Sequence, residues 1–223
     1  MTRPIGFSAF LKLLELSDAL RRSELRKKLG GGRGFQYWRP VQLAAAKAIA
    51  SRADVEQLKR QIDSMCSGHQ REYNKRALVV FCNWINGKSI RPVEILPTVD
   101  VPFGNSGLVI RIKPEVAFEL DGERFSMNLW ATTRPTLTLN TLSIGLAFCA
   151  NAYRARGHDG CGHLIFDTVS NRLFRESDIA SNVLHLLKDK VDAFKKDWAA
   201  LNPAAPGSPE GPSDHPPALD HPR

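Results

Sequence analysis

Residues 116–131 read VAFELDGERFSMNLWA and form the clearest β-hairpin pattern in the chain. In the first half of this segment large apolar side chains alternate with smaller or charged ones, which is the period-two pattern of a half-buried strand. Asp121-Gly122 predicts a two-residue turn, because this pair readily adopts the positive φ angles of a tight hairpin. Phe125, Met127 and Leu129 then resume the alternation. The segment therefore predicts two antiparallel strands.

The sequence that follows predicts a second strand pair between two helices. Asn140 is an N-cap residue for a helix over 141–156, whose Gly and Ala content permits close packing on a sheet. A second hairpin is expected over 164–175, and a last helix begins at Ser177-Asp178 with an apolar stripe at helical spacing. The order hairpin, helix, hairpin, helix predicts one domain over residues 108–202.

Residues 1–88 show helical periodicity throughout, in about five segments separated by capping residues and glycines. We expect these segments to form a basic helical domain. Residues 89–107, which contain three prolines, are expected to connect it to the second domain. Residues 203–223 hold seven of the chain's 14 prolines and few large apolar side chains, which predicts a disordered tail. The predicted fold class is α+β, an N-terminal helical bundle packed on a small, mainly antiparallel sheet with covering helices.

The positive charge of the chain lies in its first part. Residues 1–91 carry 18 Lys and Arg against 7 Asp and Glu, whereas the remainder carries 13 against 16. Such asymmetry favours a polyanionic partner, and nucleic acid more than an acidic protein or a membrane surface. A solvated basic surface that aids solubility is the alternative.

The remaining bulk features indicate a cytoplasmic protein. No apolar run reaches the ~18 residues that span a bilayer, and the N-terminus lacks a signal-peptide core. The four scattered cysteines form no CxxC pair, which is typical of free thiols in a reducing compartment. We expect no membrane association and no cofactor, and the sequence leaves the oligomeric state open.

Two arginines and three aromatic residues stand in the glycine-rich segment 30–39, which lies between basic helices. Arginines pair with phosphates, and tyrosine or tryptophan rings stack on bases. Packing of the aromatic rings against the helices is the alternative. The candidate nucleic-acid contacts are Arg21, Arg22, Arg26, Lys27, Lys28, Arg33, Tyr37, Trp38, Arg39, Arg71, Lys75 and Arg76.

Metal-binding candidates occur in two places. His158, Cys161 and His163 combine zinc-type donors in a glycine-rich loop, although a structural zinc site needs a fourth ligand that the spacing does not supply. Glu119, Asp121 and Glu123 are acids spaced two apart near a predicted strand and turn, and two carboxylates on one strand face could hold Mg²⁺. Exposed histidines in a tight connection, and acids on a solvated strand face, are the simpler interpretations.

The segment from Ile112 to Trp130, followed by a helix and another strand pair, resembles the core of the PD-(D/E)XK restriction-endonuclease-like superfamily. In that family an acid after a proline begins one strand, and a (D/E)-x-K triplet on the next strand completes a divalent-metal site that activates water. Pro114-Glu115 matches the first element. Asn128-Leu129-Trp130 stands at the second and lacks both the acid and the lysine. The resemblance therefore implies a degenerate site that no longer cleaves.

These observations predict a non-catalytic, DNA- or RNA-associated binding protein that acts through its basic helical half. Two alternatives stay open at this point. One is a protein-interaction or assembly factor, whose basic half docks an acidic protein. The other is a divergent metal-dependent nuclease with unconventional ligands.

Overall fold

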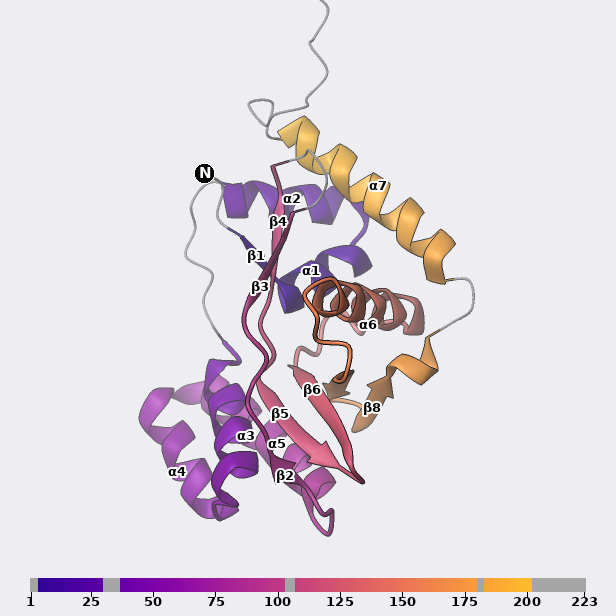
Figure 1. The fold of residues 1–223 in the computed structure, drawn as a ribbon. Helices are drawn as coiled ribbons and strands as arrows, with labels where there is room; N and C mark the ends of the chain where they lie inside the picture. The colour runs from indigo at the N-terminus through magenta and orange to yellow at the C-terminus, as the bar shows by residue number, and fades with distance from the viewer. Residues whose placement is uncertain (1–3, 30–36, 103–106, 180–182, 202–223) are drawn as a thin grey trace, which may run out of the picture.

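The computed structural model describes residues 4–29, 37–102, 107–179 and 183–201, which fold into two mixed sheets and the helices that cover them (Figure 1). The predicted α+β class is confirmed, while the predicted tail, 203–223, lies outside the described residues. The helices are α1 (Phe7–Glu15), α2 (Asp18–Leu29), α3 (Arg39–Ser51), α4 (Val55–Met65), α5 (Gly68–Ile85), α6 (Leu139–Arg154) and α7 (Val183–Leu201). The strands are β1 (Ile5–Gly6), β2 (Arg91–Pro92), β3 (Val99–Pro102), β4 (Val109–Ile112), β5 (Val116–Leu120), β6 (Glu123–Trp130), β7 (Gly162–Asp167) and β8 (Arg172–Arg175).

The larger sheet has the strand order β2-β5-β6-β7-β8. The predicted hairpin forms as β5 and β6, with Asp121 and Gly122 at positive φ angles of 55° and 82° in its turn. The second predicted hairpin forms as β7 and β8. β6 and β7 pair in parallel, because α6 lies between them in the chain and returns it to the end of the sheet where β6 begins. Within the described residues this is the one parallel pair of the larger sheet.

The smaller sheet has the order β1-β4-β3, with β4 parallel to β1 and antiparallel to β3. β3 and β2 both fall in the segment 89–107, which was predicted to connect the two halves in a partly extended form. The segment thus contributes an edge strand to each sheet.

The larger sheet separates two hydrophobic cores. On β7, Leu164 and Phe166 belong to the core with α3, α4 and α5, whereas Ile165 between them belongs to the core with α1, α6 and α7. Successive side chains of a strand point to opposite faces, so the two groups of helices cover opposite faces of the sheet. Each face therefore has its own helical layer.

The five N-terminal helices, expected to form one bundle, divide between these two cores. Phe10 of α1 and Leu25 of α2 are fully buried in the core with α6 and α7, and Leu58 of α4 is fully buried in the other. Figure 1 shows α2 at the opposite end of the molecule from α3–α5, and α1 between them beside α6. The apolar stripe of α1 packs against α6 and α7, which are distant in the sequence, and local periodicity does not reveal this contact.

The small residues of α6 permit the close packing that the sequence predicts. A Cβ atom added at Gly145 would lie 2.7 Å from Leu11 Cδ2 and 3.3 Å from Ile165 Cδ1. Contacts this short force a neighbour to move, so glycine at this position lets α1 and β7 approach α6 closely.

Two helix starts differ from the prediction. Thr138, and not Asn140, caps α6, because its hydroxyl accepts the Thr141 N–H and also donates to Glu15. Ser177-Asp178 lies in a short 3₁₀ turn, and α7 begins at Val183. None of the helices within the described ranges is long and apolar enough to cross a membrane.

The junction of α2 and α7 depends on a buried ion pair. The Arg21 guanidinium lies 2.7 Å from Asp197 Oδ2 and 2.8 Å from Asp18 Oδ1, and the Arg21 side chain is 6% exposed. Arg21→Ala should lower the free energy of unfolding by about 3 kcal/mol, because it leaves the Asp197 carboxylate buried without its main partner. Urea denaturation provides the measurement. Arg26→Ala, at an exposed position on the same helix, is the control, and an equal loss in the two variants would contradict this role.

Candidate functional site

The carboxyl ends of β6 and β7 meet at one edge of the larger sheet, where the first turn of α3 also lies. β6 ends at Trp130 and β7 at Asp167, which are opposite each other in the register. Trp38, just before α3, donates from Nε1 to Thr132 Oγ1 at 2.9 Å and joins the helix to the loop after β6. Open α/β sheets commonly bind ligands outside the carboxyl ends of parallel strands, so this edge is a candidate ligand site.

Glu115 lies at this edge, just before β5, and both of its carboxylate oxygens accept hydrogen bonds. Oε1 accepts from Gln42 Nε2 at 2.9 Å. Oε2 accepts from Asn128 Nδ2 at 3.0 Å and from the Leu129 backbone N–H at 2.9 Å. Burial raises the pKa of Glu115 to about 7, although the Leu129 and Asn128 donors favour the charged form. Amide N–H groups therefore donate hydrogen bonds to both oxygens of the Glu115 carboxyl group.

The structure places Asn128 beside Glu115. Trp130, at the position of the family's lysine, and Asp121, a candidate metal ligand, have other surroundings. Trp130 is 3% exposed and packs in the core with α1 and α6. Asp121 is in the turn at the other end of β5. Across the described residues, no group of three His, Cys, Asp or Glu side chains is placed to hold a metal ion.

The cluster of His158, Cys161 and His163 lies at the opposite edge, where β7 begins. His163 is buried: its Nδ1 atom lies 2.7 Å from Ser126 Oγ, and its ring stacks on Tyr153 with centroids 5.0 Å apart. Burial lowers the pKa of His163 to about 4 and raises that of the Cys161 thiol. The expected exposed histidine is instead a neutral core residue, beside a cavity of about 330 Å³.

Three aromatic rings and one arginine form a partly exposed surface at the carboxyl edge. We define the aromatic surface as Tyr37, Trp38, Tyr73 and Arg76. The Trp38 ring meets Tyr37 and Tyr73 edge-on, with centroids 4.8 Å and 6.5 Å away. Tyr73 is 45% exposed, and Arg76 is exposed. Trp38, Tyr73 and Arg76 line a shallow cavity of about 80 Å³, completed by Thr133, Thr168 and Val169 after the strand ends.

A buried asparagine holds the aromatic surface in place. Asn74 of α5 is completely buried; its Oδ1 accepts the Val41 N–H at 3.0 Å, and its Nδ2 donates to the Tyr37 carbonyl at 3.0 Å. Gln70 Nε2 donates to the same carbonyl at 2.8 Å. These bonds fix the turn at Tyr37 and Trp38 relative to α5. The sequence offers one signal for Asn74, a polar residue on the buried side of an otherwise apolar helix face.

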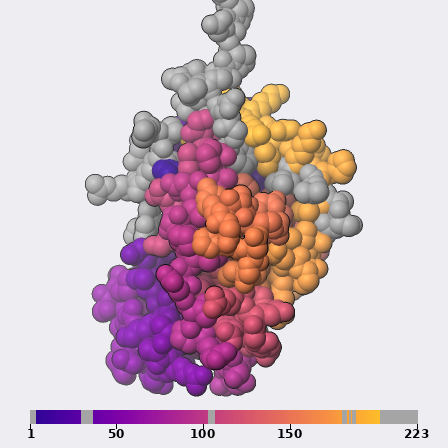
Figure 2. All heavy atoms as spheres, in the orientation of Figure 1, coloured from indigo at the N-terminus to yellow at the C-terminus, as the bar shows by residue number. Residues whose placement is uncertain are grey.

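The basic candidates do not form one continuous face. Figure 1 places α2 beside α7 at one end of the molecule, and Figure 2 shows α7 at the upper right of a face whose lower left belongs to the α3–α4 part of the chain. Arg21 is buried in its ion pair, so its prediction as a nucleic-acid contact is replaced by a structural role. Arg22 and Lys27 on α2 contact Asp197 and Glu24. Arg33 lies outside the described residues.

On α5 the basic side chains differ in their partners. Lys75 Nζ lies 2.6 Å from Asp63 Oδ1, and Arg71 Nε lies 3.7 Å from the same oxygen. Arg76 belongs to the aromatic surface and has no ion-pair partner within the described residues. Arg39 is exposed at the start of α3. Arg26 and Lys28 remain with α2, away from this edge.

The sequence matches no known protein-family model, and no curated protein is detectably similar to it.

The raised pKa of Glu115 predicts a pH-dependent stability. Between its ordinary value of 4.5 and about 7, the folded state keeps a proton that the unfolded chain has released. The free energy of unfolding therefore falls as pH rises through this window, by up to about 3 kcal/mol. Glu115→Gln removes the titrating group, so its stability relative to the unmodified protein should increase from pH 4.5 to 7. Chemical denaturation at each pH measures the difference. Glu123→Gln is the control, and a difference that does not change with pH would refute the prediction.

Proposed function

We propose that this protein is a non-catalytic nucleic-acid-binding protein and that its aromatic surface contacts a single strand of DNA or RNA. The observation that carries the proposal is the placement of Tyr73 and Trp38 beside Arg76 at the carboxyl edge of β6 and β7. Partly exposed rings next to a cation combine base stacking with phosphate pairing, which is the usual basis of single-strand binding.

The charge around the aromatic surface supports the same partner. Residues 37–88, which include α3, α4 and α5, carry nine Lys and Arg against four Asp and Glu. Arg134 is exposed and follows Thr133, which lines the cavity of the aromatic surface. A nucleic-acid strand whose bases stack on Tyr73 would thus lie among positive side chains. The positive electrostatic potential of α3, α4 and α5 favours the approach of such a polyanion.

The surroundings of Glu115 favour binding over cleavage. Metal-dependent hydrolysis needs carboxylate oxygens that are open to a cation. Here Gln42, Asn128 and Leu129 donate hydrogen bonds to both oxygens of the carboxylate, and Asn128 stands where the resemblance to the nuclease superfamily requires an acid.

Two substitutions on α5 test the proposal. Tyr73→Ala should weaken binding of a fluorescein-labelled oligo(dT) of about 16 nucleotides by about tenfold, because it removes one stacking platform. Arg76→Ala should reduce the slope of log affinity against log salt by about 0.7, the value for one phosphate of a single strand. Fluorescence anisotropy at several salt concentrations measures both quantities, and an RNA oligonucleotide of the same length gives the preference between DNA and RNA.

Arg60→Ala on α4 is the matched control, since it removes the same charge from an exposed position away from the aromatic surface. Equal effects of Arg60→Ala and Arg76→Ala on oligonucleotide affinity would mean that binding depends on net charge alone and not on the aromatic surface. No measurable binding at low salt would sink the proposal. Cleavage that requires Mg²⁺ or Mn²⁺ and is lost in Glu115→Gln would replace it with the nuclease alternative.

A further inference from the structure

A second concave surface lies at the other end of the α3–α5 layer. It is a groove of about 460 Å³ between the last turns of α3 and α5 and the segment that leads into β2. Ile49 and Ile90 are buried in its floor, and Val55 and Ile85 are half-buried along its sides. Such a volume with an aliphatic floor is within the range of ordinary binding sites.

Two cations stand at this groove, and its lining contains no carboxylate within the described residues. Arg52 and Lys88 are both exposed, and neither has an ion-pair partner in the described part of the chain. Arg52 Nη2 lies 3.5 Å from the Ile90 carbonyl, and Lys88 Nζ lies 5.6 Å from the centre of the Trp84 ring. Nearby Asp54 is engaged as the cap of α4, where its carboxylate accepts two backbone N–H groups. The groove therefore combines apolar surface with two cations that no carboxylate pairs within the described residues.

The groove also borders two helix ends. α3 ends at Ser51 and α5 at Ile85, and the last carbonyl groups of a helix lack intrahelical donors. The Arg52 and Asn86 N–H groups cap the Ala48 and Cys82 carbonyls, which satisfies only part of each end. A ligand that suits this surface offers N–H donors for the carbonyls, carboxylates for the cations and an aliphatic group for the floor. A peptide with acidic side chains has all three, whereas a fatty acid lacks the N–H donors.

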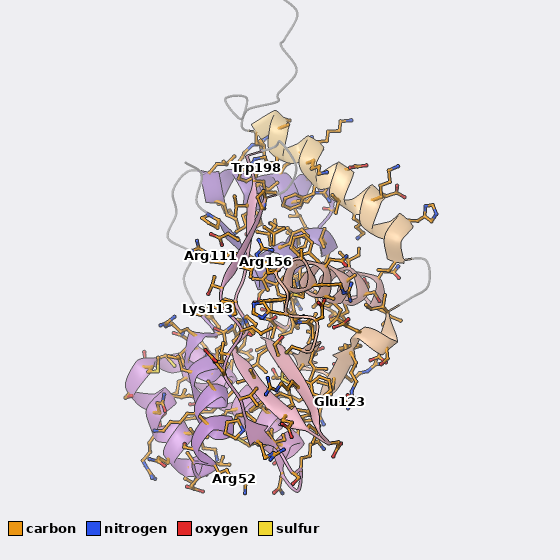
Figure 3. All side chains as sticks on the ribbon, in the orientation of Figure 1. Arg52, Arg111, Lys113, Glu123, Arg156 and Trp198 are labelled. Atoms are coloured by element: carbon orange, nitrogen blue, oxygen red, sulfur yellow. The ribbon has the colours of Figure 1, made fainter. Side chains whose placement is uncertain are left out.

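We propose that this groove docks a short acidic segment of a partner protein, with an aliphatic side chain over Ile49 and Ile90 and carboxylates against Arg52 and Lys88. Phosphates would also pair with these cations, but the floor is aliphatic and offers bases no ring on which to stack. Figure 3 places Arg52 at the end of the molecule opposite Trp198. α3 separates the groove from the aromatic surface by about 20 Å, the length of its 13 residues. The two surfaces can thus be occupied together.

The test uses the full chain and a random peptide library displayed on phage. Enriched peptides should combine Asp or Glu with Leu, Ile or Val, and the synthetic peptides should bind in a fluorescence-anisotropy titration. The double variant Arg52→Gln/Lys88→Gln should weaken that binding by about tenfold, the sum of two partly exposed charge pairs. Lys47→Gln/Arg60→Gln is the matched control, because it removes two exposed charges from the same helical layer and should leave peptide affinity unchanged.

Several outcomes would overturn the assignment. They are the absence of any enriched peptide, enrichment of sequences without acidic residues, and equal affinities of the two double variants for the selected peptides. Binding of oligo(dT) is measured on the same proteins to separate this proposal from the nucleic-acid function. Retained oligonucleotide binding in Arg52→Gln/Lys88→Gln supports two distinct surfaces. Its loss in that variant alone would assign the groove to nucleic acid.

Discussion

β6 and β7 run parallel, and this pairing constrains the position of almost every other element. A parallel connection cannot be a tight turn, so α6 has to cross one face of the larger sheet, and α1 and α7 pack on it there. The opposite face is covered by α3–α5. Because both strands end at the same edge, the loops after Trp130 and Asp167 meet beside the start of α3. These loops complete the cavity beside the aromatic surface with Thr133, Thr168 and Val169.

Polar groups at the same edge fix the geometry more closely than apolar packing does. A buried polar side chain has to find partners, and its partners are directional. Asn74 ties α5 to both Tyr37 and Val41, and Glu115 ties α3 to β6 through Gln42 and Asn128. The start of α3 is therefore held from two sides. A partner that contacts Trp38 and Tyr73 meets a surface that is already ordered, so little of its binding free energy is lost in arranging side chains.

Features with local causes could be predicted from the sequence, and features with distant partners could not. The Asp121-Gly122 turn and the hairpin of β7 and β8 each follow from a few neighbouring residues, and both are present. Arg21 looked like a surface cation because its buried carboxylate partner, Asp197, is 176 residues away. The edge-on contact of Tyr73 with Trp38 likewise depends on the packing of α5 against α3. Periodicity identifies which face of a helix is buried, but not which helix covers it.

Ion pairing separates the cationic side chains that stabilise the fold from those that can contact a partner. Arg21 and Lys75 are matched to Asp197 and Asp63, so they hold helices together and contribute little to the external field. On the α3–α5 layer, Arg76 lies beside aromatic rings at one end, and Arg52 and Lys88 lie beside an aliphatic groove at the other. A cation beside a ring favours a base with its phosphate, and a cation beside an aliphatic floor favours a carboxylate with a methyl-bearing side chain. The apolar neighbours, more than the charge, therefore distinguish the two surfaces and determine which polyanion each one selects.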